Sequence, residues 1–209
     1  MAPAYASLVF GSFFLILLTL LHFLKRELDP SWRMISEYEI GRHGWLMRLA
    51  FFCWGASVLF GTITIWPSLQ TTGGTISRWW LLVIVIFLAG AGIFKTDPIT
   101  AQTARLTNRL HQLCGAVVIL TFPIAATLSS VSLMKNPVWM PARGLLILGI
   151  VLVWLGVIIY FATIFLARSK NPKAGEGGSR IYMGWPNRFN VVTYILWLFI
   201  VAASAIHLM

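Results

Sequence analysis

Six apolar runs, each of about 20 residues, constrain the fold of this chain more than any other feature of its sequence. They cover approximately residues 5–24, 46–66, 79–94, 110–134, 144–167 and 189–208. Lipid cannot satisfy free backbone groups, so a segment that spans a bilayer is either a helix or part of a closed barrel. The runs are too long and too uniformly apolar for barrel strands. The sequence therefore predicts an all-α polytopic membrane protein, one domain over 1–209 built as a bundle of six transmembrane helices.

The composition excludes a soluble globular domain. Hydrophobic residues make up 58% of the chain and charged residues 11%, whereas soluble domains carry about 45–50% and about 25%. In a soluble protein, the net charge of +10 at pH 7 would point to nucleic acid. In a membrane protein the same excess marks cytoplasmic loops, so we expect no nucleic-acid partner. The two cysteines, Cys53 and Cys114, lie in apolar runs and indicate no disulfide framework.

The basic residues are distributed unequally between the two sides of the expected bundle. Thirteen of the 16 lie in or beside the first, third and fifth connections, and the other three are Arg78, Lys135 and Arg143. By the positive-inside rule, the odd-numbered connections are cytoplasmic. The sequence therefore predicts three helical hairpins with both termini on the non-cytoplasmic side.

The acidic residues gather on the same side, although the positive-inside rule does not require it. They are Glu27, Asp29, Glu37, Glu39, Asp97 and Glu176. No acid and no lysine lies in the middle of an apolar run, where a proton- or sodium-coupled transporter normally carries an ionisable group. Coupled transport is therefore disfavoured, and we expect any recognition through charge at the cytoplasmic face.

Two Asp-Pro pairs, Asp29-Pro30 and Asp97-Pro98, give the clearest local signals. Asp is a preferred N-cap and Pro is favoured at the next position, so each pair predicts the start of a helix. The first would be a short interfacial helix that ends near Gly41, and the second would lead into the fourth span. A role as helix caps and nothing more is the simpler interpretation of both pairs.

Polar residues are dense in the first connection and at the start of the fourth span. The segment from Ser36 to Arg42 fits either a cradle for a lipid headgroup or other anion, or an ordinary solvated loop. Arg109 and His111 lie near the membrane boundary, where polar groups are functional candidates. We expect both to join Asp97 and the first connection in one hydrogen-bonded cluster. This requires a break in the chain ahead of the fourth span, because a continuous helix would separate Asp97 from Arg109 by about 18 Å. The candidate polar residues are Asp29, Ser36, Glu37, Tyr38, Arg42, Asp97, Arg109, His111, Asn187 and Arg188.

Four histidines leave one cofactor alternative open. His22 and His111 lie at similar depths in the first and fourth spans and could ligate a single haem b, whereas no second pair exists for a two-haem conduit. No Cys-x-x-Cys or His-Glu-x-x-His spacing is present. The sequence therefore predicts no metal site and no cofactor, with a single haem as the alternative.

Short motifs in the connections occur in an order that resembles a known family. They are Asp29-Pro30, Ser36-x-Tyr38-x-x-Gly41, Trp45, Gly92-Ile93-Phe94-Lys95-Thr96-Asp97-Pro98, His111 and Asn187-Arg188. With these motifs the chain resembles, over nearly its whole length, the six-helix prokaryotic membrane proteins catalogued as domain of unknown function 998. The resemblance implies the six-helix fold and a prokaryotic plasma membrane, and it implies no activity.

The expected function is binding or processing of lipid headgroups at the cytoplasmic leaflet, with membrane lipids as partners. The one-sided polar cluster and the lack of charge at the midplane motivate this expectation. The alternative is an accessory subunit packed against a larger membrane protein complex, including a redox-linked one. The small size of the chain and its apolar helices rich in Phe and Trp motivate this alternative. The sequence does not decide whether the protein is an enzyme.

Overall fold

The computed structural model describes residues 1–101, 103–174 and 180–208, and this described part is helical with no strand. Its long helices are α1 (Ala2–Leu24), α2 (Gly44–Ile65), α3 (Thr72–Ile93), α4 (Leu106–Met134), α5 (Arg143–Lys170) and α6 (Gly184–Leu208). Three short 3-10 helices lie in the connections: η1 (Ile35–Glu39), η2 (Trp66–Ser68) and η3 (Pro137–Ala142). All six long helices are long and apolar enough to cross a membrane. The prediction of an all-α, multi-pass membrane protein is confirmed, while Glu176 lies outside the described residues.

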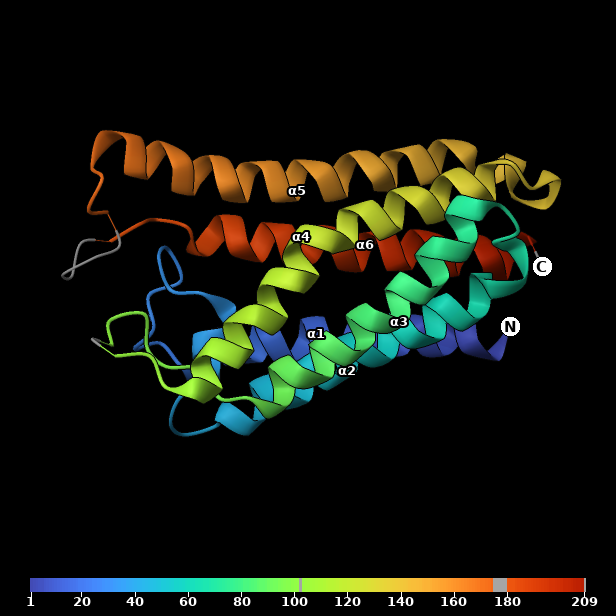
Figure 1. Ribbon diagram of the computed structural model, residues 1–209. Helices are drawn as coiled ribbons and strands as arrows, with labels where there is room; N and C mark the ends of the chain where they lie inside the picture. Colours follow the sequence, from blue (N-terminus) through green and yellow to red (C-terminus); the bar gives the residue numbers. More distant parts are fainter. Residues whose placement is uncertain (102, 175–179, 209) are drawn as a thin grey trace.

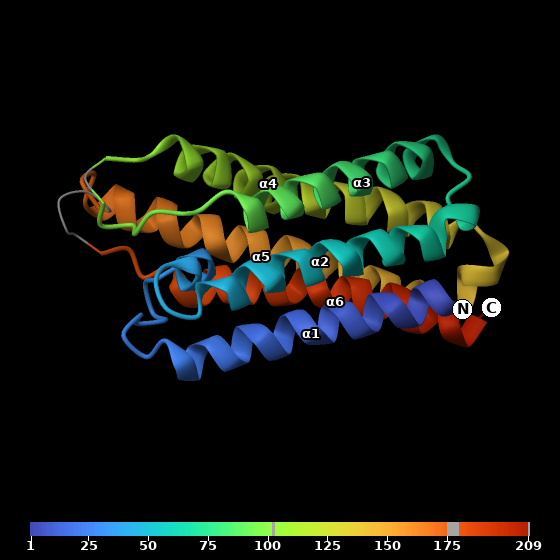
Figure 2. The ribbon, with the colours of Figure 1, turned by 90° about the horizontal axis from the view of Figure 1, so that it is seen from below.

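The helices form three hairpins, α1–α2, α3–α4 and α5–α6, whose connections gather at one end of the bundle, while both termini lie at the other (Figures 1 and 2). We call the described residues within 25–43, 94–105 and 171–183 the polar end. α1 packs against α2 and α6, α3 packs against α2 and α4, and α5 packs against α4 and α6. More of α2 and α6 is buried than of α1, α3 and α5. The hairpin arrangement is as predicted, and the side of the membrane on which the termini lie stays a prediction.

Of the six helices, α3 and α6 begin furthest ahead of their predicted apolar runs. α3 begins at Thr72 rather than near 79, because the Thr71 hydroxyl caps it by accepting a hydrogen bond from the Gly74 backbone N–H at 3.0 Å. α6 begins at Gly184 rather than near 189. Its first two turns therefore carry Asn187 and Arg188, which are both buried.

Both Asp-Pro pairs form turns, and neither begins a helix. The Asp29 carboxylate accepts a hydrogen bond from the Ser31 backbone N–H at 2.9 Å, and η1 starts only at Ile35. The Asp97 carboxylate accepts from the backbone N–H of Arg105, the residue that precedes α4, at 2.9 Å. The two expected helix starts are therefore wrong, because each carboxylate satisfies an N–H group further along the chain. The break that the cluster required ahead of α4 is present.

The chain turns sharply between η1 and α2. Gly41 and His43 have φ angles of 75° and 65°, in the left-handed region. A Cβ on Gly44 would lie 1.9 Å from the carbonyl oxygen of Glu39, so the close approach of these two backbones requires glycine. The turn holds the end of η1 against the start of α2 and thereby fixes the position of Glu39.

A proline shapes α4. Pro123 lies inside the helix and has no N–H for the carbonyl of Ile119, four residues earlier. The Tyr194 hydroxyl of α6 donates to that carbonyl at 2.6 Å, and its ring stacks on Phe122 with centroids 4.4 Å apart. Figure 1 shows α4 bending part-way along its length. The bend turns the first half of α4 away from α6, while the Tyr194 hydrogen bond joins the two helices at Ile119.

Candidate functional site

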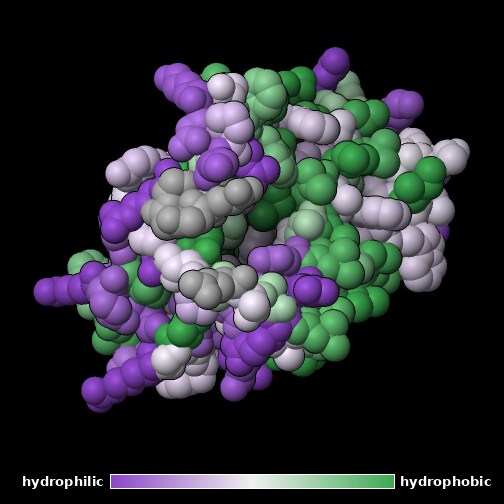
Figure 3. All heavy atoms as spheres, turned by 60° about the vertical axis from the view of Figure 1, so that its left-hand side comes forward, coloured by the Kyte–Doolittle hydropathy of each residue, from purple (hydrophilic) through white to green (hydrophobic). Residues whose placement is uncertain are grey.

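A cavity of about 450 Å³ opens at the polar end between α4 and its neighbours. Figure 3, which looks toward this end, shows a hollow with a partly hydrophilic rim and a hydrophobic interior. The volume lies within the range of about 300–1,000 Å³ that is common for ligand pockets. Its polar lining residues are Ser36, Glu37, Thr96, Asp97, Asn108, His111, Gln112, Tyr160 and Asn187. Its deeper apolar lining includes Phe51, Trp54, Leu88, Val118 and Val191.

One side of the cavity reaches the outer surface of the bundle between α4 and α5. Gln112, Ala116 and Leu120 follow one another at helical spacing along α4, line the cavity and are exposed. Phe161 of α5 also lines it and is 40% exposed. Both helices are long enough to span a membrane, so this side of the cavity opens on the outer surface of two spanning helices.

Glu37 joins the first and third connections at the rim. Its carboxylate accepts hydrogen bonds from the Arg33 guanidinium at 2.5 Å and from the backbone N–H groups of Met34 and Ile99 at 3.2 and 2.9 Å. The carboxylate is buried, and these three donors compensate its charge. Glu37 therefore holds the two connections together around the mouth of the cavity.

Asp97 is held in the same way by groups from the start of α4. Its carboxylate accepts from the Nε and the backbone N–H of Arg105, at 2.6 and 2.9 Å. These hydrogen bonds hold the pKa of Asp97 below its usual range. The Asn108 side-chain oxygen accepts from the Asp97 backbone N–H at 3.0 Å and from the Thr96 hydroxyl at 3.1 Å. The segment after α3 is thus fastened to the first turn of α4.

His111 lies buried at the end of the cavity with a defined tautomer. Its Nδ1 lies 2.9 Å from the carbonyl oxygen of Phe94 and 3.1 Å from that of Ala91. Carbonyl oxygens only accept, so Nδ1 carries the hydrogen and Nε2 of the neutral ring is an acceptor. Phe51 meets the ring edge-on at a centroid distance of 5.7 Å. Among the described residues, no group hydrogen-bonds to Nε2.

Glu39 lies behind His111 and outside the cavity lining. Its Oε2 is 3.9 Å from Nδ1 of His111 and accepts from the Thr96 backbone N–H at 3.2 Å. Its Oε1 lies 3.6 Å from Nε of Arg48 and is buried without a hydrogen bond from the described residues. Burial raises the pKa of Glu39 to about 7, although the Thr96 N–H and Arg48 oppose the shift. Glu39 was not among the candidate residues, although its connection as a whole was expected to meet His111.

Arg188 forms a second cluster, separate from the cavity. The buried guanidinium donates to Nε2 of His22 at 2.8 Å and to the Tyr38 hydroxyl at 2.8 Å. It also donates to the carbonyl oxygens of Arg33, Gly184 and Pro30, at 2.7, 2.9 and 3.3 Å. This cluster fastens the first connection to α6.

The geometry does not favour His22 as a haem ligand. Its Nδ1 lies 2.7 Å from the carbonyl oxygen of Leu18, so Nδ1 carries the hydrogen, and Nε2 accepts from Arg188. Both nitrogens are therefore engaged with protein groups. Among the described residues, no group of three or more His, Cys, Asp and Glu side chains is placed to hold a metal ion.

The structure brings only part of the expected cluster together. The cavity is lined by Ser36 and Glu37 of η1, Asp97 of the connection between α3 and α4, His111 of α4 and Asn187 of α6. Tyr38 and Arg188 belong to the second cluster.

Three candidates stand apart from both groups. Asp29 and Arg42 are exposed, and Arg109 is exposed with no acid of the described chain within ion-pair distance. The expectation that Arg109 pairs with the first connection is wrong, because it is Asn108, one position earlier on α4, that faces the interior. The helical spacing of Asn108 and Gln112 was the signal for the inward face.

Comparison with known proteins agrees with the motifs in the connections. A family model described as protein of unknown function (DUF998) matches residues 8–204. No curated protein and no solved structure matches the chain. Since the match covers all six long helices and the polar end between them, the chain belongs to the DUF998 family of proteins of unknown function.

Proposed function

We propose that this protein binds a membrane amphiphile, with the polar head at the rim of the cavity and the apolar chain between the helices. The observation that carries the proposal is the cavity itself: its wall is polar at the connections, apolar between the spanning helices, and open to the outer surface of the bundle between α4 and α5. Ligand sites typically have a mainly apolar wall with a few polar groups at defined positions.

The length of the cavity suits a chain as well as a head. Its lining on α4 extends from Asn108 to Leu120, which at 1.5 Å per residue is about 18 Å along the helix. This is more than half of the hydrocarbon thickness of about 30 Å. A ligand whose head lies beside Asn108 can therefore place a long apolar segment beside Leu120.

The side of the membrane follows from the charge distribution. Thirteen of the 16 basic residues lie in or beside the connections of the polar end, which supports a cytoplasmic position for it under the positive-inside rule. In this orientation the cavity takes its ligand from the cytoplasmic leaflet of a prokaryotic plasma membrane. Binding is the part of the lipid-handling expectation that the cavity supports, and no described geometry favours a particular reaction.

An accessory-subunit role is not proposed. Exposed apolar side chains on α1 and α5, such as Phe13 and Phe165, would carry contacts to a larger complex. The same side chains are required for contact with lipid, so they do not distinguish the two roles.

The test fills the cavity from a position that tolerates a side chain. Gly115 lines the cavity, and a Cβ on it would meet nothing within 4 Å, so Gly115→Leu should occupy the cavity without disturbing the helix. Gly144, at the start of α5 and outside the lining, has equally open surroundings, and Gly144→Leu is the matched control.

Native mass spectrometry of each protein, released from membranes in a mild detergent, reads out the bound amphiphile. We expect one adduct mass on the wild type and on Gly144→Leu, and at least a tenfold lower occupancy on Gly115→Leu. Equal adducts on all three proteins, or none on the wild type, would overturn the proposal.

A further inference from the structure

We infer that the head group held in this cavity is an uncharged hydroxyl, as in a long-chain alcohol or a glyceride, and not a phosphate or a carboxylate. The inference rests on the proposed function and specifies the class of ligand. For the first connection the sequence leaves open a cradle for a lipid headgroup or other anion, or an ordinary solvated loop, and the inference differs from the anion cradle.

The charges around the cavity disfavour an anion. Within the part of the chain that the structure describes, no lysine or arginine lines it. Arg33 and Arg105, which contact the two lining carboxylates, are already bound to Glu37 and Asp97. An anionic head would therefore enter a lining that holds two carboxylates and offers no free cation, and desolvating it there would be costly.

The same pairing disfavours a cationic head. Glu37 accepts hydrogen bonds from one guanidinium and two backbone N–H groups. Asp97 accepts from the side chain and backbone of Arg105. Both carboxylates are thus compensated by protein groups, and an ammonium group would have to displace an arginine to gain an ion pair.

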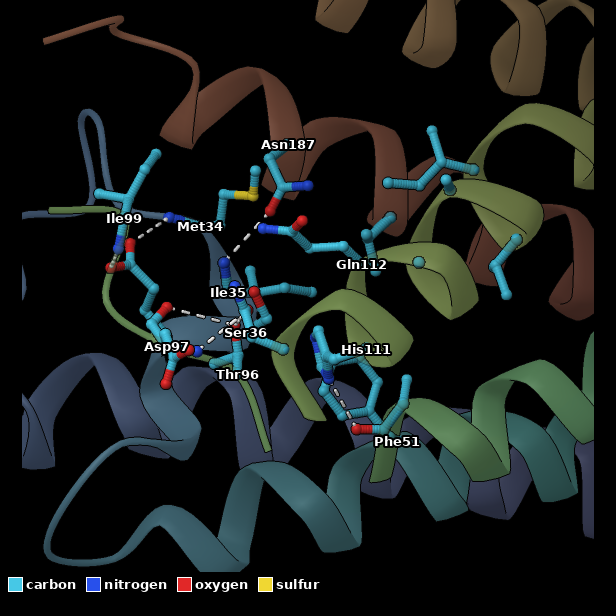
Figure 4. A pocket seen from close by; sticks show the side chains of 18 of the residues that line it. Met34, Ile35, Ser36, Phe51, Thr96, Asp97, Ile99, His111, Gln112 and Asn187 are labelled. Atoms are coloured by element: carbon cyan, nitrogen blue, oxygen red, sulfur yellow. Dashed lines mark hydrogen bonds between the residues drawn. The ribbon is translucent and has the colours of Figure 1, made fainter. Parts of the chain in front are cut away.

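The lining offers a ligand the hydroxyls of Ser36 and Tyr160, which hydrogen-bond to no described residue, and three further polar groups. Nε2 of His111 is an acceptor, because Nδ1 holds the hydrogen toward two carbonyls. The Asn187 side-chain oxygen accepts from the Ile35 backbone N–H at 3.2 Å, which leaves its NH₂ as a donor. Gln112 lines the cavity, is exposed and makes no side-chain hydrogen bond with the described residues. Figure 4 shows Gln112 on α4 and Asn187 on α6 reaching toward the same space.

A hydroxyl group matches this set because it both donates and accepts. Its hydrogen can be donated to Nε2 of His111, while its oxygen, with two lone pairs, accepts from the amides of both Asn187 and Gln112. A deprotonated carboxylate or phosphate only accepts hydrogen bonds, so it would leave Nε2 of His111 without a partner. Its oxygens would also face the lone pair of this nitrogen. An alkane chain without a head would leave all three groups unpaired.

Binding competition tests the inference on the full chain in phosphatidylcholine nanodiscs. Tritiated hexadecanol is the probe, and the competitors are 1-palmitoylglycerol, palmitate, hexadecyl phosphate and hexadecylamine. All carry a chain of the same length, so they differ in the head alone. We expect hexadecanol or 1-palmitoylglycerol to bind at least tenfold more tightly than any of the charged compounds, and the tighter of these two identifies the source of the hydroxyl.

A variant at the head position adds a second measurement. Gln112 is exposed and not required by the fold, so Gln112→Leu should fold and should weaken hexadecanol about fivefold to tenfold, the equivalent of one hydrogen bond. Gln70→Leu, an exposed glutamine at the opposite end of the bundle, is the control and should leave the affinity unchanged.

The outcomes separate the inference from the proposed function. If palmitate, hexadecyl phosphate or hexadecylamine binds as tightly as the alcohols or more tightly, the inference fails and the proposed function stands. An unchanged affinity of Gln112→Leu for hexadecanol would also overturn the assignment of the head to this end. If none of the five compounds binds, the proposed function itself fails.

Discussion

Replacement of Arg188 by methionine removes the group that fastens the first connection to the last helix. Methionine keeps an unbranched side chain of similar length and offers no hydrogen-bond donor. The substitution leaves five acceptors without their donor: Nε2 of His22, the Tyr38 hydroxyl and the carbonyl oxygens of Pro30, Arg33 and Gly184.

The expected loss of folding free energy follows from the burial of Arg188. Arg188 is only 4% exposed, so the groups it leaves behind are largely shielded from water. Removal of one member of a buried charged network costs about 3–5 kcal/mol, because the remaining polar groups stay buried and unpaired. At about 2–4 °C per kcal/mol for a chain of this size, Tm should fall by about 6–20 °C. Arg188→Lys keeps the positive charge but lacks the planar guanidinium, so its Tm should lie between those of the wild type and of Arg188→Met.

The assay is thermal unfolding of the purified chain in detergent, followed by circular dichroism of the helices. Arg109→Met is the matched control, because Arg109 also lies near the start of a spanning helix but is exposed. A surface change of this kind should alter the stability by no more than about 0.5 kcal/mol. If Arg188→Met lowers Tm no more than Arg109→Met does, the guanidinium does not hold the first connection, and the reasoning is refuted.

Three further predictions concern pH, packing and orientation. Because the pKa of Glu39 is raised from 4.5 to about 7, the folded state keeps a proton between these pH values that the unfolded state releases. The free energy of unfolding should therefore fall by at most about 3 kcal/mol as the pH rises through this window. Denaturant titrations should show no such fall for Glu39→Gln. A Cβ on Gly90 would lie 2.6 Å from Sγ of Cys114, so Gly90→Ala should cost about 1–3 kcal/mol, and Cys114→Ala in the same chain should restore most of the loss in Tm. In intact cells an impermeant thiol reagent should label Gln70→Cys and leave Arg42→Cys unlabelled, since both positions are exposed at opposite ends of the bundle.

Each of these three predictions has a result that would contradict it. Parallel pH profiles for the wild type and Glu39→Gln would mean that this carboxyl does not titrate in the window. A double variant no more stable than Gly90→Ala would place the strain elsewhere than at Cys114. Labelling of Arg42→Cys with protection of Gln70→Cys would invert the orientation and move the cavity to the outer leaflet.

The spans were predictable because their signal is additive along the sequence. About 20 apolar residues in a row identify a spanning helix whatever its neighbours are, and the run at 110–134 corresponds closely to α4. The start of α3 was not predictable in this way, because Thr72, Gly73 and Gly74 contribute little apolar character. That start depends on a single side-chain cap at Thr71.

The site was predictable as a set of residue types and not as a geometry. Polar residues beside spanning helices drew attention to Glu37, Asp97 and His111, and these residues do line the same cavity. Which face of α4 points inward depends on its rotation, and one position, Asn108 against Arg109, changes the direction of a side chain by about 100°. The contact between His22 and Arg188 joins residues far apart in the sequence, and no local pattern indicates such a pair.

The contacts of α6 with the first connection have a consequence for the order of synthesis. Residues 25–43 leave the ribosome early, whereas Gly184, Asn187 and Arg188 emerge with the last helix. The Gly184 backbone N–H donates to the carbonyl of Ser31 at 3.0 Å, and Asn187 accepts from the Ile35 N–H. The first connection therefore waits for most of the chain to be inserted before it can adopt its final conformation. A nascent chain arrested before Gly184 would hold five spans in the membrane and still present an unfastened loop to proteases on that side of the membrane.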